Sequence, residues 1–226
     1  MTTFDIKLWH SSKVNDEHGN DIRSRVEDYL EQGVTHINHT LLASTEGTIG
    51  APEECHATSF TTSYPCDRSF DTTYDDVFYW WDDYTRCNVD NLASDSNLLI
   101  TKCDDGTEGG LAGDTKAHAT GNQIQNLPAS HTTYENSDGA WSMGVAMQEV
   151  GHNLQSGVSD SDNDGEGEHD TAITYSHDDQ IYGTPMGVTY WDDMEGNNEC
   201  EESYNDPADS DYVHFNYSSC AGKNMN

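Results

Sequence analysis

The amino-acid sequence predicts an α+β fold, a mixed α/β sandwich built on a twisted and mostly parallel sheet with an edge strand. Three observations favour this fold class. Short alternating or continuous apolar runs are typical of strands, amphipathic runs with helical spacing lie between them, and polar or glycine-rich stretches separate the two kinds. At 226 residues the chain suits one domain with a buried core. We expect an N-terminal lobe over residues 1–158 and a smaller, irregular C-terminal lobe over 159–226.

The first part of the N-terminal lobe is predicted as strand, helix and strand. Residues 4–8 alternate apolar and polar side chains, which indicates an opening strand. Residues 20–32 place their apolar side chains on one stripe, which predicts an amphipathic helix that stops at Gly33. A second strand is expected near 34–42, before an insertion over 44–70 that is rich in Ser, Thr, Gly and Pro.

The second part of this lobe alternates the same element types. Residues 72–86 carry an aromatic run for which a helix is favoured and a strand is the alternative. Residues 97–101 form a compact apolar strand, and the glycine-rich residues 109–113 indicate an edge strand or an irregular lip. Residues 140–155 place apolar side chains at helical spacing and predict a helix, whereas His118 is expected in a polar loop.

The charge of the chain limits its partners. The formal net charge of -33 comes from 42 acidic and 9 basic residues. Such a chain repels nucleic acid and anionic membrane surfaces, so we expect neither as a partner. High net charge is also typical of disorder, but 5 Trp and 12 Tyr are enough to form a core. The composition therefore indicates a folded halophilic protein whose acidic surface keeps it in solution at high salt.

The cysteines indicate disulfide bonds rather than a zinc ribbon. The six cysteines include no Cys-x-x-Cys pair. Their even number favours disulfides and an extracellular location, with buried free thiols as the alternative. The first residues do not resemble a signal peptide, so we expect any signal or pro-segment to precede this numbering. We expect bridges between sequence neighbours: Cys55–Cys66, Cys87–Cys103 and Cys200–Cys220.

One octet carries most of the chemical information. Residues 147–154 read Met-Gln-Glu-Val-Gly-His-Asn-Leu, which matches the zinc-protease pattern His-Glu-x-x-His except at Gln148. Positions 148 and 152 are one helical turn apart, so their side chains project from the same face. His152 can bind a metal ion, and Glu149 beside it can take a proton from an attacking water. The octet therefore predicts a zinc-dependent hydrolase site.

The order of these segments resembles that of the metzincin-type zinc metalloproteases. In that clan, Leu-Leu-Thr and Gly-Leu-Ala segments precede an active-site helix that ends in Gly-His-Asn-Leu-Gly. Here Leu-Leu-Ile-Thr at 98–101, Gly-Gly-Leu-Ala at 109–112 and Gly-His-Asn-Leu at 151–154 follow in that order. The segment Gly-Thr-Pro-Met-Gly at 183–187 is placed like the clan's Met-turn. The resemblance covers about residues 4–190, has specific motifs only in the helix and the Met-turn, and implies a zincin-like fold.

The resemblance implies a role for each matched residue. Glu149 would be the catalytic base and acid in attack on a peptide carbonyl, and His152 would be a zinc ligand. Met186 would support the site without binding metal, and Tyr190 would be an oxyanion donor. An extended polypeptide substrate would pair by strand addition with the edge segment, which consists of Gly109, Gly110, Leu111 and Ala112.

Two departures from the clan's pattern concern the metal ligands. Gln148 replaces a histidine, and an amide oxygen is a weaker zinc ligand than an imidazole. The third ligand should lie six residues after His152, where this chain has Val158. A longer loop must therefore supply it, and we expect His169 because its acidic neighbours could orient an imidazole. The reserve candidates are Asp160 and His177.

The same loop also suggests a calcium site. Asp160, Asp162 and Asp164, followed by Gly165, fit the start of an EF-hand calcium loop. The last ligand position holds Thr171 instead of the usual glutamate, so a true EF-hand is not expected. Calcium that braces a protease loop stays open as one interpretation, and a solvated acidic turn of a halophilic protein as the other.

These observations together predict a secreted zinc metalloendopeptidase that acts as a monomer on polypeptides at high salt. The expected cofactor is Zn²⁺, with Ca²⁺ as a second candidate. Two alternatives remain. The chain could be a catalytically inactive zincin-fold binding protein, because Gln148 weakens metal binding, or a calcium-stabilised extracellular interaction domain.

Overall fold

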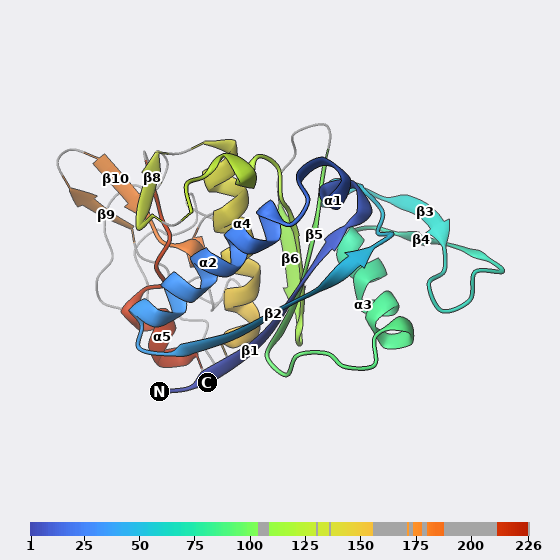
Figure 1. The fold of residues 1–226 in the computed structure, drawn as a ribbon, viewed down its shortest axis with the longest axis horizontal. Coiled ribbons are helices and arrows are strands. Elements are labelled where there is room, and N and C mark those ends of the chain that lie inside the picture. Colours follow the sequence, from blue (N-terminus) through green and yellow to red (C-terminus); the bar gives the residue numbers. More distant parts are fainter. Residues whose placement is uncertain are drawn as a thin grey trace, which may run out of the picture.

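The central element of the fold is a five-stranded sheet in the order β2-β1-β5-β7-β6 (Figure 1). The computed structural model of the chain describes residues 1–103, 109–129, 131–135, 137–155, 171, 174–177, 180–187 and 212–225. The strands of the sheet are β1 (Thr3–Ser11), β2 (Thr40–Ile49), β5 (Ser96–Thr101), β6 (Gly110–Gly113) and β7 (Lys116–Thr120). All neighbouring strands pair in parallel except β6, which runs antiparallel to β7 at one edge. The expected mostly parallel sheet and its edge strand are confirmed.

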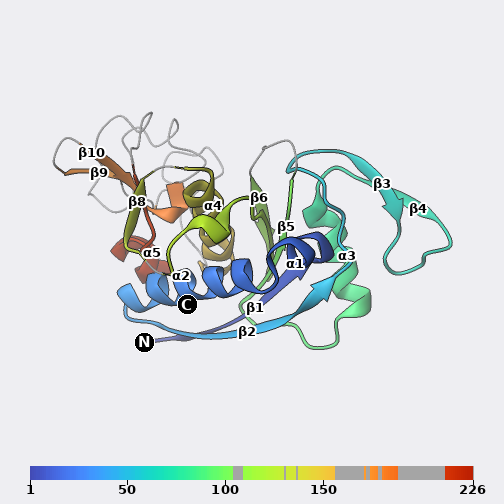
Figure 2. The ribbon, with the colours of Figure 1, turned by 45° about the horizontal axis from the view of Figure 1, so that its top comes forward.

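Helices cover both faces of the sheet and make three layers (Figure 2). The helices of these layers are α1 (Ser12–His18), α2 (Asp21–His36), α3 (Val77–Asn88) and α4 (Asp138–Leu154). Successive side chains of a strand point to opposite faces. Leu98 and Ile100 of β5 accordingly join a core with α2 and α4, whereas Leu99 joins a second core with α3. Among the described residues, no helix combines the length and apolarity needed to cross a bilayer.

Helix α2 is longer than the sequence predicts. It continues through Gly33 to His36, and β2 begins only at Thr40, so the expected helix end and strand start are wrong. A Cβ at Gly33 would lie 2.8 Å from Met147 Cε and 3.2 Å from Tyr217 Cδ2. The glycine therefore allows close packing within the helix instead of ending it.

The insertion after β2 is more regular than expected. Strand β3 (Phe60–Ser63) pairs with β4 (Asp71–Tyr74) in a hairpin that extends at one end of the molecule (Figure 1). Helix α3 follows, and the Asp76 side chain caps it by accepting a 2.8 Å hydrogen bond from the Phe78 N–H. The helix favoured for 72–86 is thus confirmed from residue 77 onward, and β4 occupies its expected start.

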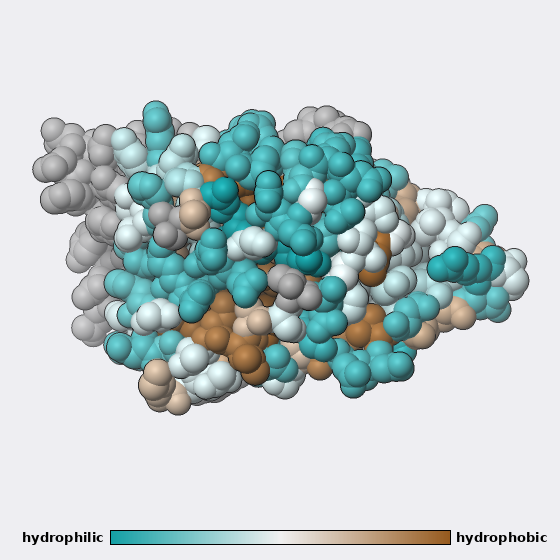
Figure 3. Space-filling view, in the orientation of Figure 1, coloured by the Kyte–Doolittle hydropathy of each residue, from teal (hydrophilic) through white to brown (hydrophobic). Residues whose placement is uncertain are grey.

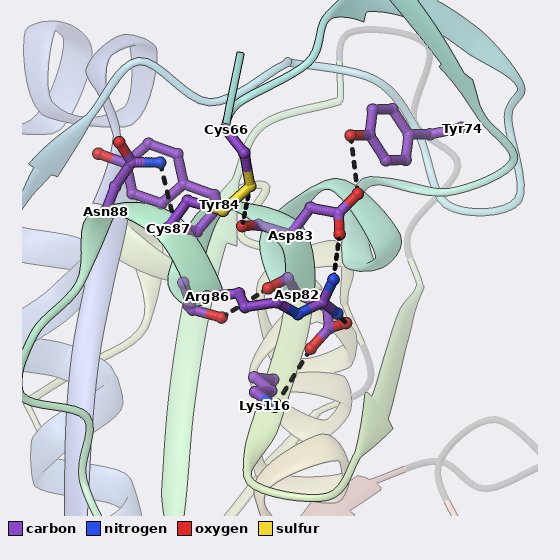
Figure 4. A network of polar contacts seen from close by, with 10 residues as sticks. Cys66, Tyr74, Asp82, Asp83, Tyr84, Arg86, Cys87, Asn88 and Lys116 are labelled. Atoms are coloured by element: carbon purple, nitrogen blue, oxygen red, sulfur yellow. Dashed lines mark hydrogen bonds and ion pairs between the residues drawn. A yellow bond between two sulfur atoms is a disulfide. The ribbon is translucent and has the colours of Figure 1, made fainter.

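Two disulfides differ from the expected pairing. Cys55 pairs with Cys103 and Cys66 with Cys87, so the bridges Cys55–Cys66 and Cys87–Cys103 are wrong. Strands β2 and β5 both run parallel to β1, so their carboxyl ends meet at one edge of the sheet, and Cys55 and Cys103 follow those ends. The hairpin that holds Cys66 lies against the last turn of α3, which carries Cys87 (Figure 4). Cys55 therefore pairs with a cysteine that is near in space but is not the next one in the sequence, whereas Cys66 pairs with the next one.

The C-terminal segment packs onto the same core as α2 and α4. Val213, Phe215 and Tyr217 belong to that core, and Gln155 after α4 forms a bridge with Met225. A second sheet has the order β8-β11-β10-β9, with β8 (Thr133–Glu135), β11 (Tyr212–His214), β10 (Gln180–Gly183) and β9 (Thr174–His177). Short helices complete this part: η1 (Ile124–Asn126), η3 (Pro185–Gly187) and α5 (Ser219–Asn224). The division into lobes at residue 158 stays a prediction.

Candidate active site at the edge strand

Helix α4 carries the zinc-protease-like octet. Ser137 caps it by accepting a hydrogen bond from the Ala140 N–H at 3.3 Å, and Asp138 in the first turn complements the helix dipole. The helix contacts β5, β6 and β7 of the sheet as well as η3 and β11 of the C-terminal segment. Packing on both sides explains why nearly all of its residues are buried. The helix expected over 140–155 is confirmed, with its start at residue 138.

Glu149 lies beneath the start of the edge strand. Its side chain is only 4% exposed, although it is a carboxylic acid in a highly charged protein. A Cβ at Gly110 would lie 2.5 Å from Glu149 Cγ, so the strand backbone sits directly on this side chain. Burial raises the pKa of Glu149 to about 8, and the negative charge of Asp76 adds to the rise. Such a group has the proton affinity of a general base near neutral pH.

Gln148 and His152 provide two donor groups of the kind that zinc accepts. Gln148 is almost fully buried, whereas His152 is partly exposed. A catalytic zinc site normally takes three protein ligands. Within the described residues, no group of three or more His, Cys, Asp or Glu is arranged to hold a metal ion. The pair on α4 therefore fits zinc only together with a further ligand from another part of the chain.

Met186 packs against α4 beside the octet. Its side chain is buried, and η3 contacts the helix. A Cβ at Gly151 would collide with Met186 Sδ and would lie 3.0 Å from Tyr217 Cε1. The Met-turn segment at 183–187 thus packs against the helix turn between Glu149 and His152, where the role predicted for Met186 would place it. That role itself stays a prediction.

Among the described residues, the edge segment is paired on one side only. Strand β6 pairs only with β7 in the central sheet, and all four of its residues are partly exposed. Gly109 precedes the strand, and its N–H donates to Thr120 Oγ1 at 3.0 Å while its carbonyl accepts from the Thr120 N–H at 3.0 Å. No described strand pairs with the opposite side of β6, where another extended chain could add.

Of the site residues predicted after residue 158, His177, Met186 and Cys220 lie among the described residues. His177 is the last residue of β9, in the second sheet. The remaining ones lie outside the described residues: His169, Asp160, Asp162, Asp164, Tyr190 and Cys200. Cys220 is disulfide-bonded, and because Cys200 lies outside the described residues the expected bridge between them stays a prediction. The third zinc ligand, the oxyanion donor and the calcium site also stay predictions.

Sequence reasoning missed a buried polar cluster behind the edge strand. Asp76 at the cap of α3 lies between two imidazoles: His56 Nδ1 is 2.9 Å from its Oδ2, and His118 Nδ1 is 3.6 Å from its Oδ1. His118 is fully buried on β7, so its expected place in a polar loop is wrong. The alternation Lys-Ala-His-Ala-Thr at 116–120 is the strand signal that could have placed it.

No protein-family model matches the chain, and no curated protein matches it.

Proposed function

We propose that the chain is a secreted zinc-dependent endopeptidase, with Glu149 as its general base. One observation carries the proposal: a nearly fully buried carboxyl on α4 lies directly under a half-open edge strand. His152 is one turn further along the same helix, so a metal ligand and a base belong to one rigid element. The two disulfides fit an extracellular protein.

Glu149 moves the proton in the proposed reaction. It takes a proton from water while the water oxygen forms a bond to the peptide carbonyl carbon. It then delivers a proton to the amide nitrogen as the C–N bond breaks, so that one water is consumed for each peptide bond. The closeness of the β6 backbone keeps this carboxyl away from bulk solvent, which strengthens its interactions with the reacting groups.

The zinc site of this proposal draws on both helix and loop. His152 and Gln148 would hold the ion from α4, and His169 is the candidate for the third position. When bound, zinc would act as a Lewis acid that polarises the substrate carbonyl and the attacking water. Met186 would keep the helix turn between Glu149 and His152 in place by packing against Gly151.

The proposed substrate is an extended polypeptide. The side of β6 with which no described strand pairs would offer backbone N–H and C=O groups for strand addition. Gly109 and Gly110 have no side chains to hold a peptide away, so the scissile bond can approach Glu149 closely. Backbone pairing would provide affinity for many sequences.

The proposal is tested by metal content and peptide cleavage of the purified protein at high salt. We expect about one zinc per chain and hydrolysis of casein that stops on chelation. Glu149→Gln keeps the size of the side chain but removes the base, so turnover should fall by about 100-fold or more. The matched control is Glu135→Gln at an exposed position of β8, which should cleave casein like the wild type. Full activity of Glu149→Gln would refute the proposal.

A second candidate function, favoured by Gln148, is a peptide-binding protein of the same architecture without turnover. An amide at this position weakens zinc binding without affecting the pairing edge. This candidate predicts that casein peptides bind at high salt but stay intact, even with zinc in excess. Calcium-dependent melting without retained zinc would instead support a calcium-stabilised interaction domain.

A further inference from the structure

The start of the edge strand lies in a slot between two side chains. A Cβ at Gly109 would lie 2.7 Å from both Cγ and Cδ2 of His56. A Cβ at the next residue, Gly110, would lie 2.5 Å from Glu149 Cγ and 2.6 Å from the backbone oxygen of His118. Neighbouring residues of an extended chain face opposite sides, so His56 lies on the α3 side of the strand and Glu149 on the α4 side. Only two successive glycines fit this slot.

Asp76 organises the α3 side of the slot. Its side chain is 4% exposed and accepts hydrogen bonds from the Ala57 N–H at 2.6 Å and the Phe78 N–H at 2.8 Å. His56 and His118 lie against its two oxygens at 2.9 and 3.6 Å. One carboxylate thus connects the loop at 56–57, the start of α3 and the strand β7.

The surroundings hold this cluster together from two more directions. His118 Nε2 lies 2.9 Å from Thr101 Oγ1, which connects the cluster to β5. The disulfide Cys55–Cys103 fixes the residue before His56 to the end of that strand. Burial raises the pKa of Asp76, but His118, His56 and the capping N–H together outweigh it and hold the pKa well below its usual range. The lowered pKa favours the charged form of Asp76, whose carboxylate lies between the two imidazoles.

We propose that Asp76 is a positioning residue, which through His56 and His118 fixes the start of β6 and so sets the distance between the peptide-pairing edge and Glu149. The inference rests on the proposed function, because it assigns the slot a role in placing a substrate. The supporting observation is geometric: His56 lies 2.9 Å from the Asp76 carboxylate and fills the space that a Cβ of Gly109 would need. A peptide paired with β6 follows that backbone, so a shift of the strand moves the peptide relative to Glu149.

A double-variant cycle tests the contact between His56 and the strand. The reporter is hydrogen exchange of the Thr120 amide, whose N–H donates to the Gly109 carbonyl. Gly109→Ala should displace the strand and His56→Ala should leave it unsupported, so each should speed Thr120 exchange by about tenfold. The double variant should exchange more slowly than Gly109→Ala alone, because loss of the ring atoms Cγ and Cδ2 removes two of the three close contacts of the added methyl and leaves only the one with Cβ of residue 56. Gly50→Ala, where a Cβ meets no atom within 4 Å, is the control and should leave the rate unchanged.

A charge-removal pair tests Asp76 itself. Asp76→Asn keeps a good helix cap but weakens the hold on both imidazoles, so Thr120 exchange should again rise by about tenfold. With casein as substrate, KM should rise more than kcat falls, because displacement of β6 weakens peptide binding more than it slows hydrolysis of the bound peptide. The control is Asp82→Asn on the same helix, which pairs with Arg86 and Lys116 on the surface (Figure 4). It should change neither quantity.

The outcomes separate this inference from the proposed function. Exchange at Thr120 that stays at the wild-type rate in Asp76→Asn and His56→Ala would overturn the inference, whatever the activity. Additive effects of Gly109→Ala and His56→Ala would also overturn it, because the two sites would then be independent. Faster exchange without any cleavage of casein would support the fixing of β6 by Asp76 and refute the protease. If Asp76→Asn does not fold, the cycle of His56 and Gly109 decides.

Discussion

Gln148 is the residue whose replacement would change the proposed site most directly. Its side chain is almost fully buried one turn before His152 on the same helix. An imidazole binds zinc more strongly than an amide oxygen does, so Gln148→His should raise zinc affinity by about tenfold or more. Equilibrium dialysis against a zinc buffer measures this change. Gln125→His, on η1 near the opposite end of α4, is the control. Equal affinities of all three proteins would place residue 148 outside the metal site.

His214 should make the fold sensitive to acid well above the usual range for carboxylates. Burial lowers the pKa of His214 to about 4, and the nearby His36 adds to the decrease. The unfolded chain, with a histidine pKa of about 6.5, binds more protons than the native state between these two values. Stability is therefore complete above about pH 6.5 and falls as the pH drops toward about 4.

The His214 prediction is measured by urea unfolding at pH 7 and pH 5 in the same high salt. Because the ring is partly exposed, we expect it to account for about 1 kcal/mol of the stability that wild type loses. His214→Gln should lose correspondingly less. His131→Gln, at an exposed position, is the control and should behave like the wild type. Equal pH dependence in all three proteins would contradict the assignment.

At the scale of elements, helix α4 is held by close approaches that leave no room for a methyl group. Alanine favours a helix over glycine by about 1 kcal/mol, so propensity alone predicts that Gly151→Ala stabilises the protein. A Cβ there would collide with Met186 Sδ and press on Tyr217, and overpacking of this kind costs about 1–3 kcal/mol. We expect a net loss of stability in urea unfolding, and Met186→Ala should relieve part of it. Gly50→Ala, in open space, should be neutral. A stabilised Gly151→Ala would show that the helix can shift.

Sequence patterns predict those helices and strands whose apolar spacing alone determines their secondary structure, whatever they pack against. The strand at 97–101 and the helix at 140–155 are predicted to within two residues of their observed ends, because a continuous apolar run and a helical stripe both reflect burial directly. Gly33 misled, because glycine both ends helices and permits close packing, and only the contact with Met147 decides between these roles. The disulfide pairing misled because it follows the parallel order of strands rather than sequence distance.

The candidate site was predictable to a similar extent. The octet predicts that Glu149 and His152 are neighbours on one helix, because helical spacing fixes their relation, while their roles stay predictions. The Asp76 cluster joins a loop, a helix start and a strand that are separated by many residues, so no local pattern contains it. In the sequence, Asp76 predicts only a helix cap before an aromatic run.

At the scale of the whole molecule, the net charge of -33 should make folding depend on salt. Hydrophilic residues cover most of the face shown in Figure 3. On α2, burial raises the pKa of Glu27, and the neighbouring charges of Asp28 and Glu31 raise it further, whereas Arg23 lowers it only in part, so carboxylates on this helix repel one another. The Debye length is about 10 Å at about 0.1 M salt and about 3 Å at about 1 M, so salt screens this repulsion.

We therefore expect the melting temperature to fall steeply when salt is removed. The double variant Asp28→Asn/Glu31→Gln lowers the repulsion on α2, and its melting temperature should fall less than that of the wild type. Glu17→Gln is the matched control, because that carboxylate pairs with Lys102 and its loss removes an attraction instead. Its melting temperature should fall at least as much as that of the wild type. If the double variant and the control respond to salt alike, the salt dependence does not arise from repulsion among surface carboxylates. Specific ion binding would then have to explain how so acidic a chain folds.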